Sequence, residues 1–149
     1  MHKKLNNEIY QYACSNENSD DSTFEIIDNG AWDENKMGIS YSSLKVKDEY
    51  LKHDNVSMNT FKNVEVINVK TRKLNSILEE AEVESVDFLS VDTEGWELEV
   101  VQGFNIEKYN PKVVLLENYI YTPTYEQYMD SIGYKLDTRL NYNYIFVKK

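Results

Sequence analysis

A nearly continuous apolar run that ends in a cluster of acidic residues is the feature that most constrains the fold of this chain. It lies in residues 86–104, VDFLSVDTEGWELEVVQGF. Residues 86–91 have the pattern of a strand that is covered on both faces, as in a parallel sheet. Residues 96–104 have the spacing of an amphipathic helix, and Trp96 is expected to pack in the core from its apolar face. Residues 112–117, KVVLLE, repeat the buried-strand pattern. The order strand, helix, strand predicts an α/β sheet with two parallel strands joined by a helical crossover.

Shorter elements are expected on both sides of this unit, within a single domain of 149 residues. The apolar patterns and the turn residues predict strands over 8–14, 23–27, 63–70, 134–138 and 142–149, and helices over 71–82 and 122–132. The first two strands are expected to pair as a hairpin, the strand over 63–70 to lie near a sheet edge, and the last two to form a C-terminal antiparallel hairpin. Only one short strand, near 38–42, is expected within 28–50, and 53–62 is expected to be a polar connector.

Two of the expected buried strands end in acids, Asp92 and Glu117. Ligands of an open α/β sheet bind beyond the carboxyl ends of its strands. If the two strands are neighbours, Asp92, Glu94 and Glu117 come together on one rim, and Gly95 lets the backbone turn sharply or lets a ligand approach closely. Such acids could orient a substrate hydroxyl, bind a cation or take a proton, and their spacing does not choose among these roles.

The same residues have an equally good structural explanation. Asp92 or Thr93 caps the helix that follows, and Glu94 and Glu97 lie in its first turn, where the helix dipole favours an anion. Glu97 is expected to point away from the apolar face of this helix. On spacing alone, the functional and the structural explanations are equally well supported.

Composition excludes several classes of partner and site. The net charge of −10 and the absence of a basic patch argue against nucleic acid. Cys14 is the only cysteine, so no internal disulfide can form, and the two histidines, His2 and His53, have no metal-site spacing. A zinc site built from histidine and cysteine is therefore excluded, and no residue is assigned as a metal ligand. No signal peptide and no membrane-spanning segment is visible, so a cytoplasmic location with no membrane partner is expected.

The acidic segment and the strand after it, PKVVLLENY, resemble the C-terminal half of the FkbM family of S-adenosylmethionine-dependent methyltransferases. The positions that match the family pattern are Asp87, Leu89, Asp92, Glu94, Gly95, Glu97, Gly103, Pro111 and Glu117. Residues 9–26, 66–80 and 136–149 are similar to further family segments, so the resemblance covers nearly the whole chain.

The chain also departs from the family pattern. Ser90 replaces the usual lysine, and Asn75 replaces an aspartate. The glycine-rich loop that cradles the cofactor is not found, because no two of the five glycines lie within a few residues of each other. We therefore expect an α/β fold with a partial Rossmann-like, class I methyltransferase sheet that lacks the N-terminal cofactor-binding unit. Three explanations stay open: a fragment of a longer frame, a split protein completed by a second chain or a second copy, and a degenerate remnant.

The resemblance implies an S-adenosylmethionine-dependent methyltransferase that acts on oxygen of a sugar or another small hydroxylated metabolite. It implies that Asp92 and Glu94 lie where substrate meets cofactor, with Glu117 nearby as a third catalytic acid. Asp92 would then also contact the cofactor, and Ala13 and Cys14 would lie near its adenine edge.

Two other functions stay open. The chain could be a non-catalytic interaction module of the same fold, which the missing glycine loop favours. It could also hold a divalent cation on Asp92, Glu94 and Glu117, although nothing supplies a nucleophile or a base for hydrolysis. Trp32 is the better candidate for an exposed aromatic residue near a substrate pocket, since loops often carry function.

Overall fold

The computed structural model describes residues 8–28, 41–61 and 63–149. The strands are β1 (Ala13–Cys14), β2 (Ser19–Asp28), β3 (Asn63–Arg72), β4 (Phe88–Val91), β5 (Val113–Glu117), β6 (Tyr134–Leu140) and β7 (Asn143–Lys148). The helices are α1 (Asp48–His53), the short 3-10 helix η2 (Met58–Thr60), α2 (Leu74–Glu80), α3 (Glu97–Gln102), α4 (Ile106–Tyr109) and α5 (Thr124–Ser131). Trp32, Gly30, Gly38 and most of the strand expected near 38–42 lie outside the described residues.

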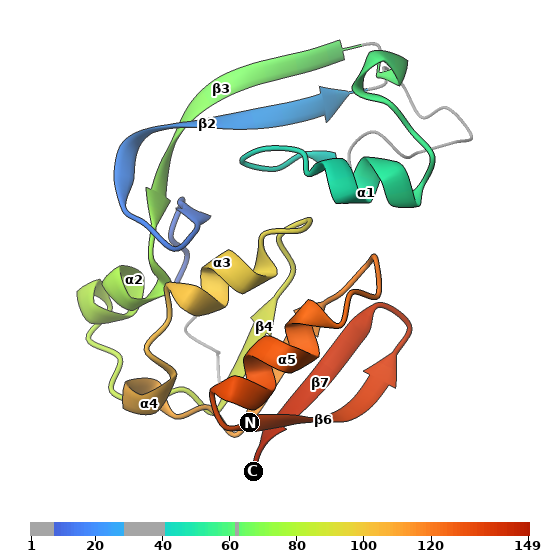
Figure 1. The fold of residues 1–149 in the computed structure, drawn as a ribbon. Helices are drawn as coiled ribbons and strands as arrows, with labels where there is room; N and C mark the ends of the chain where they lie inside the picture. The colour runs from blue at the N-terminus through green and yellow to red at the C-terminus, as the bar shows by residue number, and fades with distance from the viewer. Residues whose placement is uncertain (1–7, 29–40, 62) are drawn as a thin grey trace, which may run out of the picture.

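The described strands form two mixed sheets, with the orders β1-β3-β2 and β4-β5-β7-β6. In Figure 1, β2 and β3 make a long curved ribbon above a body that contains the second sheet and helices α3 and α5. The expected α/β class and the C-terminal antiparallel hairpin, β6 with β7, are confirmed. Because the strands lie in two separate sheets, the Rossmann-like topology stays a prediction. No helix among the described residues has the length and apolar character needed to cross a bilayer.

The first sheet corrects two predictions. The first two strands do not pair with each other as a hairpin, because β1 runs parallel to β3 and β2 runs antiparallel to it. The strand predicted near an edge, β3, is therefore the central strand of this sheet. Long-range contacts set this arrangement: the Asn18 side chain accepts a hydrogen bond from the Lys73 amide at 2.7 Å, and the hydroxyls of Ser22 and Thr71 lie 3.0 Å apart. A local pattern of apolar residues does not contain that information.

The strand β4 is covered on one face only, which corrects the prediction of a strand buried on both faces. Leu89 and Val91 are buried, whereas Ser90 is exposed and Phe88 is 55% exposed. Among the described residues, the helices that pack on this sheet lie on the side of Leu89 and Val91. The apolar run therefore predicts the strand correctly, but it does not predict that one face of the strand is exposed.

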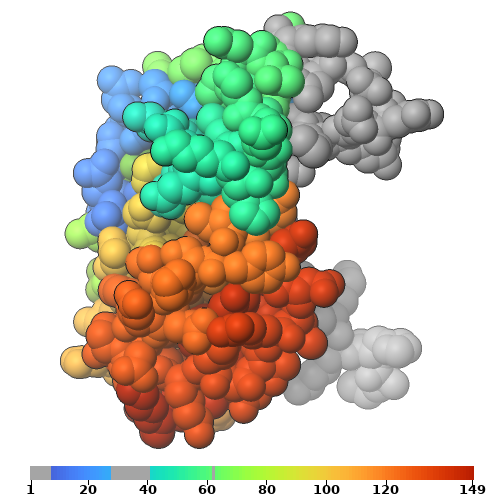
Figure 2. Space-filling view, turned by 45° about the vertical axis from the view of Figure 1, so that its right-hand side comes forward, coloured from blue at the N-terminus to red at the C-terminus, as the bar shows by residue number. Residues whose placement is uncertain are grey.

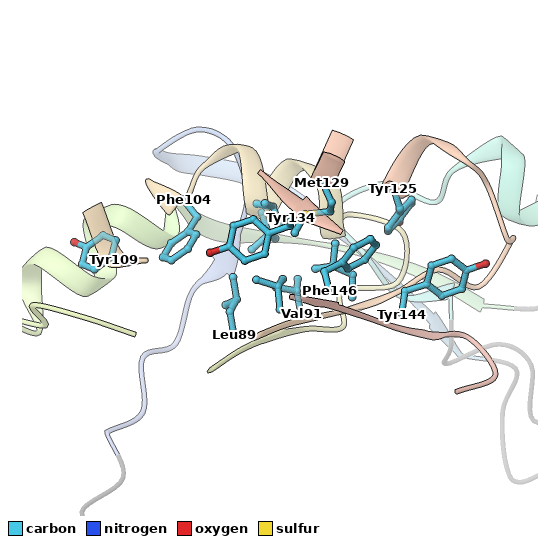
Figure 3. Close-up of a cluster of buried hydrophobic side chains, with 13 residues drawn as sticks. Leu89, Val91, Phe104, Tyr109, Tyr125, Met129, Tyr134, Tyr144 and Phe146 are labelled. Atoms are coloured by element: carbon cyan, nitrogen blue, oxygen red, sulfur yellow. The ribbon is translucent and has the colours of Figure 1, made fainter. Parts of the chain in front are cut away.

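The main core fills the space between the second sheet and its helices (Figure 3). Its thirteen buried residues are Leu89, Val91, Val100, Val101, Phe104, Tyr109, Val114, Leu116, Tyr125, Met129, Tyr134, Tyr144 and Phe146. Burial of each large side chain contributes about 1.5–3 kcal/mol. Helix α5 contributes Tyr125 and Met129 to this core. Trp96 is not in this core: it is half-buried, its Nε1 donates to the Lys45 carbonyl at 3.0 Å, and Lys47 lies over its ring.

A second, smaller core joins α1 to the chain that follows β5. Its buried residues are Ile27, Tyr41, Val46, Tyr50, Leu51 and Phe61, and Tyr119 and Ile120 pack against it. Figure 2 shows the teal region that includes α1 directly against the orange region that includes the chain after β5. Helix α1 was not predicted, although it has acids in its first turn and bases in its last, as the helix dipole favours. This helix brings Tyr50 to the loop at the carboxyl end of β4.

Candidate functional site

The acids at the ends of β4 and β5 lie on one rim, as predicted. The two strands are parallel neighbours, with Phe88 opposite Val113 and Val91 opposite Leu116. Asp92 follows β4 directly and Glu117 is the last residue of β5, so both side chains start from the same edge of the sheet. Carboxylate oxygens of Asp92, Glu97 and Glu117 lie within 4.8 Å of one another.

Glu97 is the residue that sequence reasoning misplaced. It was expected to point away from the apolar face of α3, but its side chain is fully buried. One oxygen accepts hydrogen bonds from the Thr93 amide at 2.8 Å, the Gly95 amide at 3.1 Å and the Thr93 hydroxyl at 3.3 Å. The other accepts from the Tyr125 hydroxyl at 2.6 Å. Glu97 therefore holds the loop after β4 against α5.

These bonds also correct the capping explanation. The N-cap position of α3 is Trp96, and no side chain caps it there. The carboxylate of Glu97 reaches back to the two loop amides instead, so neither Asp92 nor Thr93 is the cap. The spacing of acids before an apolar helix was a correct sign of a helix start, but the carboxylate that holds the loop comes from inside the helix.

The loop makes a sharp turn at Glu94 and Gly95, as predicted for the glycine. Both residues have positive φ, 52° and 96° respectively. A side chain at Gly95 would place its Cβ 2.9 Å from Cε2 of the Tyr50 ring. Gly95 therefore serves two purposes: it allows the turn, and it allows the ring of Tyr50 to pack against the backbone.

A cavity of about 170 Å³ lies beside this turn. Its lining residues are Tyr41, Tyr50, Asp54, Glu94, Glu117, Tyr119 and Tyr142. The structure thus brings the predicted acids Glu94 and Glu117 to one cavity, with Asp92 beside Glu117 on the rim. Ala13 and Cys14 do not line it, because they form β1 in the other sheet. Their predicted contact with the cofactor adenine stays a prediction.

Burial makes both cavity glutamates weak acids. Burial, with the charges of Asp92 and Glu97, raises the pKa of Glu94 to about 7. Burial, with the charges of Asp92, Glu94 and Glu97, raises the pKa of Glu117 to about 7 as well. Such a carboxylate is available to accept a proton near neutral pH, which is the condition for a general base.

Asp54 holds the aromatic side of the cavity in place. It accepts hydrogen bonds from the hydroxyls of Tyr41 and Tyr119, and the imidazole Nδ1 of His53 lies 2.9 Å from its Oδ1. Burial alone would raise the pKa of Asp54, but these hydrogen bonds outweigh it and lower the pKa. Burial and the bond to Asp54 raise the pKa of Tyr119 to about 12, so its hydroxyl stays protonated. Asp54 is therefore a charged anchor for two tyrosines.

Sequence reasoning missed the four tyrosines of the cavity. The chain contains twelve tyrosines, an abundance that looks like a compositional bias and not like a site. The four come from segments near residues 41–50, 119 and 142, so no spacing along the chain connects them. The only local signal was the pattern of charges that marks α1.

The raised pKa values predict that the protein loses stability as pH rises toward neutral. An unfolded glutamate releases its proton near its ordinary pKa of 4.5, whereas folded Glu94 keeps its proton until about 7. Between these values the folded chain binds more protons, so the free energy of unfolding falls with rising pH. Glu94→Gln removes this loss and is expected to stabilise the protein by about 1 kcal/mol at about pH 8, a value discounted for solvent screening.

Urea unfolding of both proteins tests this prediction. The advantage of Glu94→Gln should grow between about pH 5.5, which is above the pI of 4.7, and about pH 8. The exposed residue Glu84 offers a control, because Glu84→Gln should change stability equally at both pH values. An advantage of Glu94→Gln that is the same at both pH values would contradict the raised pKa.

Comparison with known proteins agrees with the resemblance seen in the sequence. Residues 1–140 match the family model described as the methyltransferase FkbM domain. Comparisons with curated proteins and with solved structures gave no significant match.

Proposed function

The chain belongs to the FkbM methyltransferase family, and from this premise we propose that it transfers a methyl group from S-adenosylmethionine to oxygen of a sugar or another small hydroxylated metabolite. Family membership supports a methyltransferase function in general and suggests a class I methyltransferase-like fold. The acceptor and its oxygen chemistry are our proposal. The observation that carries it is the meeting of Asp92, Glu94 and Glu117 on one rim beside a small cavity.

The cavity glutamates suit the acceptor side of such a reaction. An acceptor hydroxyl becomes a better nucleophile when its proton passes to a base as the new bond forms. Glu94 and Glu117, each with a pKa near 7, are the bases that the cavity offers, and the proton would end on a carboxylate oxygen. Asp54 and the tyrosine hydroxyls that it holds would orient the acceptor.

The described residues do not form a complete site for the cofactor. A pocket for a molecule of drug size usually has about 300–1,000 Å³, more than the 170 Å³ found here. Gly95 and Gly103 offer no open cradle, because the Tyr50 ring and the Ser15 carbonyl occupy the space beside them. We therefore assign the cavity to the acceptor. We propose that the rest of the cofactor site comes from residues outside the described part, from a second chain or from a second copy.

Calorimetric titration of the folded chain with S-adenosylmethionine tests the proposed function. We expect saturable binding in the millimolar range, because Asp92 at the rim contributes but the glycine-rich loop that would cradle the cofactor is not found in the sequence. Asp92→Asn, at an exposed position, is expected to weaken this binding about tenfold through loss of a charged hydrogen-bond acceptor. Glu84→Gln is the control that should bind as the unchanged chain does.

The competing function is an interaction module without turnover. Absence of binding at millimolar S-adenosylmethionine, in a sample shown to be folded by circular dichroism, would favour the module and reject an enzyme that this chain forms without a second chain. Equal binding by the unchanged chain and Asp92→Asn would reject the role of Asp92 at the cofactor while leaving the cofactor itself in place.

A further inference from the structure

The cavity between α1 and the ends of β4 and β5 has a composition that a general base alone does not explain. Four of its seven lining residues are tyrosines and three are carboxylates. None of the seven is a lysine or an arginine. Among the described residues, neither Glu94 nor Glu117 takes part in an ion pair. The cavity therefore has aromatic walls and two carboxylates, Glu94 and Glu117, whose charge no lysine or arginine among the described residues neutralises.

The aromatic wall is continuous. The ring of Tyr50 stacks on that of Tyr119 with centroids 5.6 Å apart, and the ring of Tyr142 lies 4.8 Å from that of Tyr119. Asp54 fixes Tyr41 and Tyr119 through their hydroxyls, so these rings are held in position. Aromatic rings attract ammonium groups, because the ring quadrupole places negative charge on the ring face.

Tyr50 provides an observation that is independent of the acids. Tyr50 is 4% exposed, and its buried hydroxyl makes no hydrogen bond of acceptable distance and angle among the described residues. The nearby Tyr125 hydroxyl already donates its own proton to Glu97. Burial, followed by the charge on Glu97, raises its pKa, so the hydroxyl is a neutral donor. Tyr50 lines the cavity together with Glu94 and Glu117, so its side chain lies beside the acids. An unpaired buried hydroxyl is costly, and a bound oxygen atom would remove that cost.

We propose that the cavity binds the ammonium group of a hydroxylated small molecule, an amino alcohol or an amino sugar. Glu94 and Glu117 supply the opposite charge, the tyrosine rings supply the wall, and the Tyr50 hydroxyl donates to an oxygen of the ligand. That the bound molecule is also the methyl acceptor rests on the proposed function. The volume of about 170 Å³ compares with the roughly 150 Å³ cavity that holds benzene in another protein, so one small ring or short chain fits.

An organic cation suits this space better than a metal ion. Magnesium requires about six oxygen ligands in a near-octahedral shell at about 2.0–2.1 Å. Of the three acids that lie close enough together for a metal, Glu97 already accepts four hydrogen bonds with its two oxygens. Tyrosine rings give no ligand to magnesium, but they do stabilise an ammonium group.

The experiment compares choline with its uncharged isostere 3,3-dimethylbutan-1-ol, which has the same shape and hydroxyl. Binding to the folded chain is measured by calorimetry without cofactor, at about pH 8, where both cavity glutamates are largely ionised. We expect choline to bind at least about tenfold more tightly than the isostere. Glu117→Gln is expected to remove most of this difference, and the exposed control Glu84→Gln to keep it. The comparison of the two ligands on the unchanged chain does not depend on any variant.

The outcomes separate this inference from the proposed function. Equal affinity for the two ligands, or no binding of choline to a folded sample, overturns the ammonium site even when S-adenosylmethionine binds. Displacement of choline by magnesium overturns it in favour of a metal site. Displacement of choline by S-adenosylmethionine would mean that the cofactor occupies the cavity, which overturns its assignment to the acceptor. Simultaneous binding of choline and S-adenosylmethionine supports the assignment to the acceptor. Choline selectivity in a chain that binds no S-adenosylmethionine supports the ammonium site and rejects a methyltransferase formed by this chain alone.

Discussion

Replacing Glu97 with alanine is expected to lower the free energy of unfolding by about 3–5 kcal/mol. The truncation removes an acceptor that four donors share, and it leaves the Tyr125 hydroxyl and the amides of Thr93 and Gly95 without their partner. The side chain is fully buried, so water cannot replace it without rearrangement. Urea unfolding followed by circular dichroism measures the change.

Two variants show whether the loss comes from this network. Tyr125→Phe removes a single hydrogen bond and is expected to cost about 1–2 kcal/mol. Glu84→Ala, at an exposed position, is expected to change stability by less than about 0.5 kcal/mol. A cost for Glu97→Ala as small as that of the exposed control would mean that the Glu97 carboxylate does not stabilise the loop after β4. The stabilising role given to Glu97 would then be wrong.

Gly95→Ala is expected to cost about 2–4 kcal/mol, for two separate reasons. The φ of 96° is one that residues with a side chain rarely adopt, and the new Cβ would lie 2.9 Å from the Tyr50 ring. This ring cannot move away easily, because it is buried and stacked on Tyr119. Displacement of the ring would also alter the cavity, so the variant should lose choline binding together with stability.

Two other glycines separate the backbone effect from the steric one. Gly133 has a φ of 87° but nothing within 4 Å of a Cβ, so Gly133→Ala measures the backbone effect alone, at about 1 kcal/mol. Gly103 has an ordinary φ, but a Cβ would lie 2.4 Å from the Ser15 carbonyl oxygen, so Gly103→Ala measures a steric clash with backbone. Thermal or urea unfolding of the three variants should rank Gly95→Ala below Gly133→Ala in stability; the reverse order would contradict the packing of Tyr50 against Gly95.

Several parts of the fold could be predicted because neighbouring residues encode them. The strands β4 and β5 and the hairpin of β6 and β7 follow local apolar patterns. The turn after β4 follows from Gly95, because glycine adopts positive φ without strain. Convergence of Asp92 and Glu117 also follows, since two consecutive parallel strands place their carboxyl ends together. The pairing of β1 and β2 with β3 could not be predicted in the same way, because it depends on contacts between residues about fifty positions apart.

The sequence by itself determined that this chain is an α/β protein of the FkbM family with acids at the ends of two parallel strands. The alternation of apolar and polar residues, the turn residues and the motif spacing are local properties, so they can be read without knowing the rest of the fold. Only the tertiary structure decided that Glu97 turns inward to hold the loop and that four tyrosines close a cavity over Glu94 and Glu117. The reason is physical: burial and hydrogen bonding depend on which distant segments pack together. Helix α1 is more than forty residues away from the acids in sequence and lies beside them only in the folded chain.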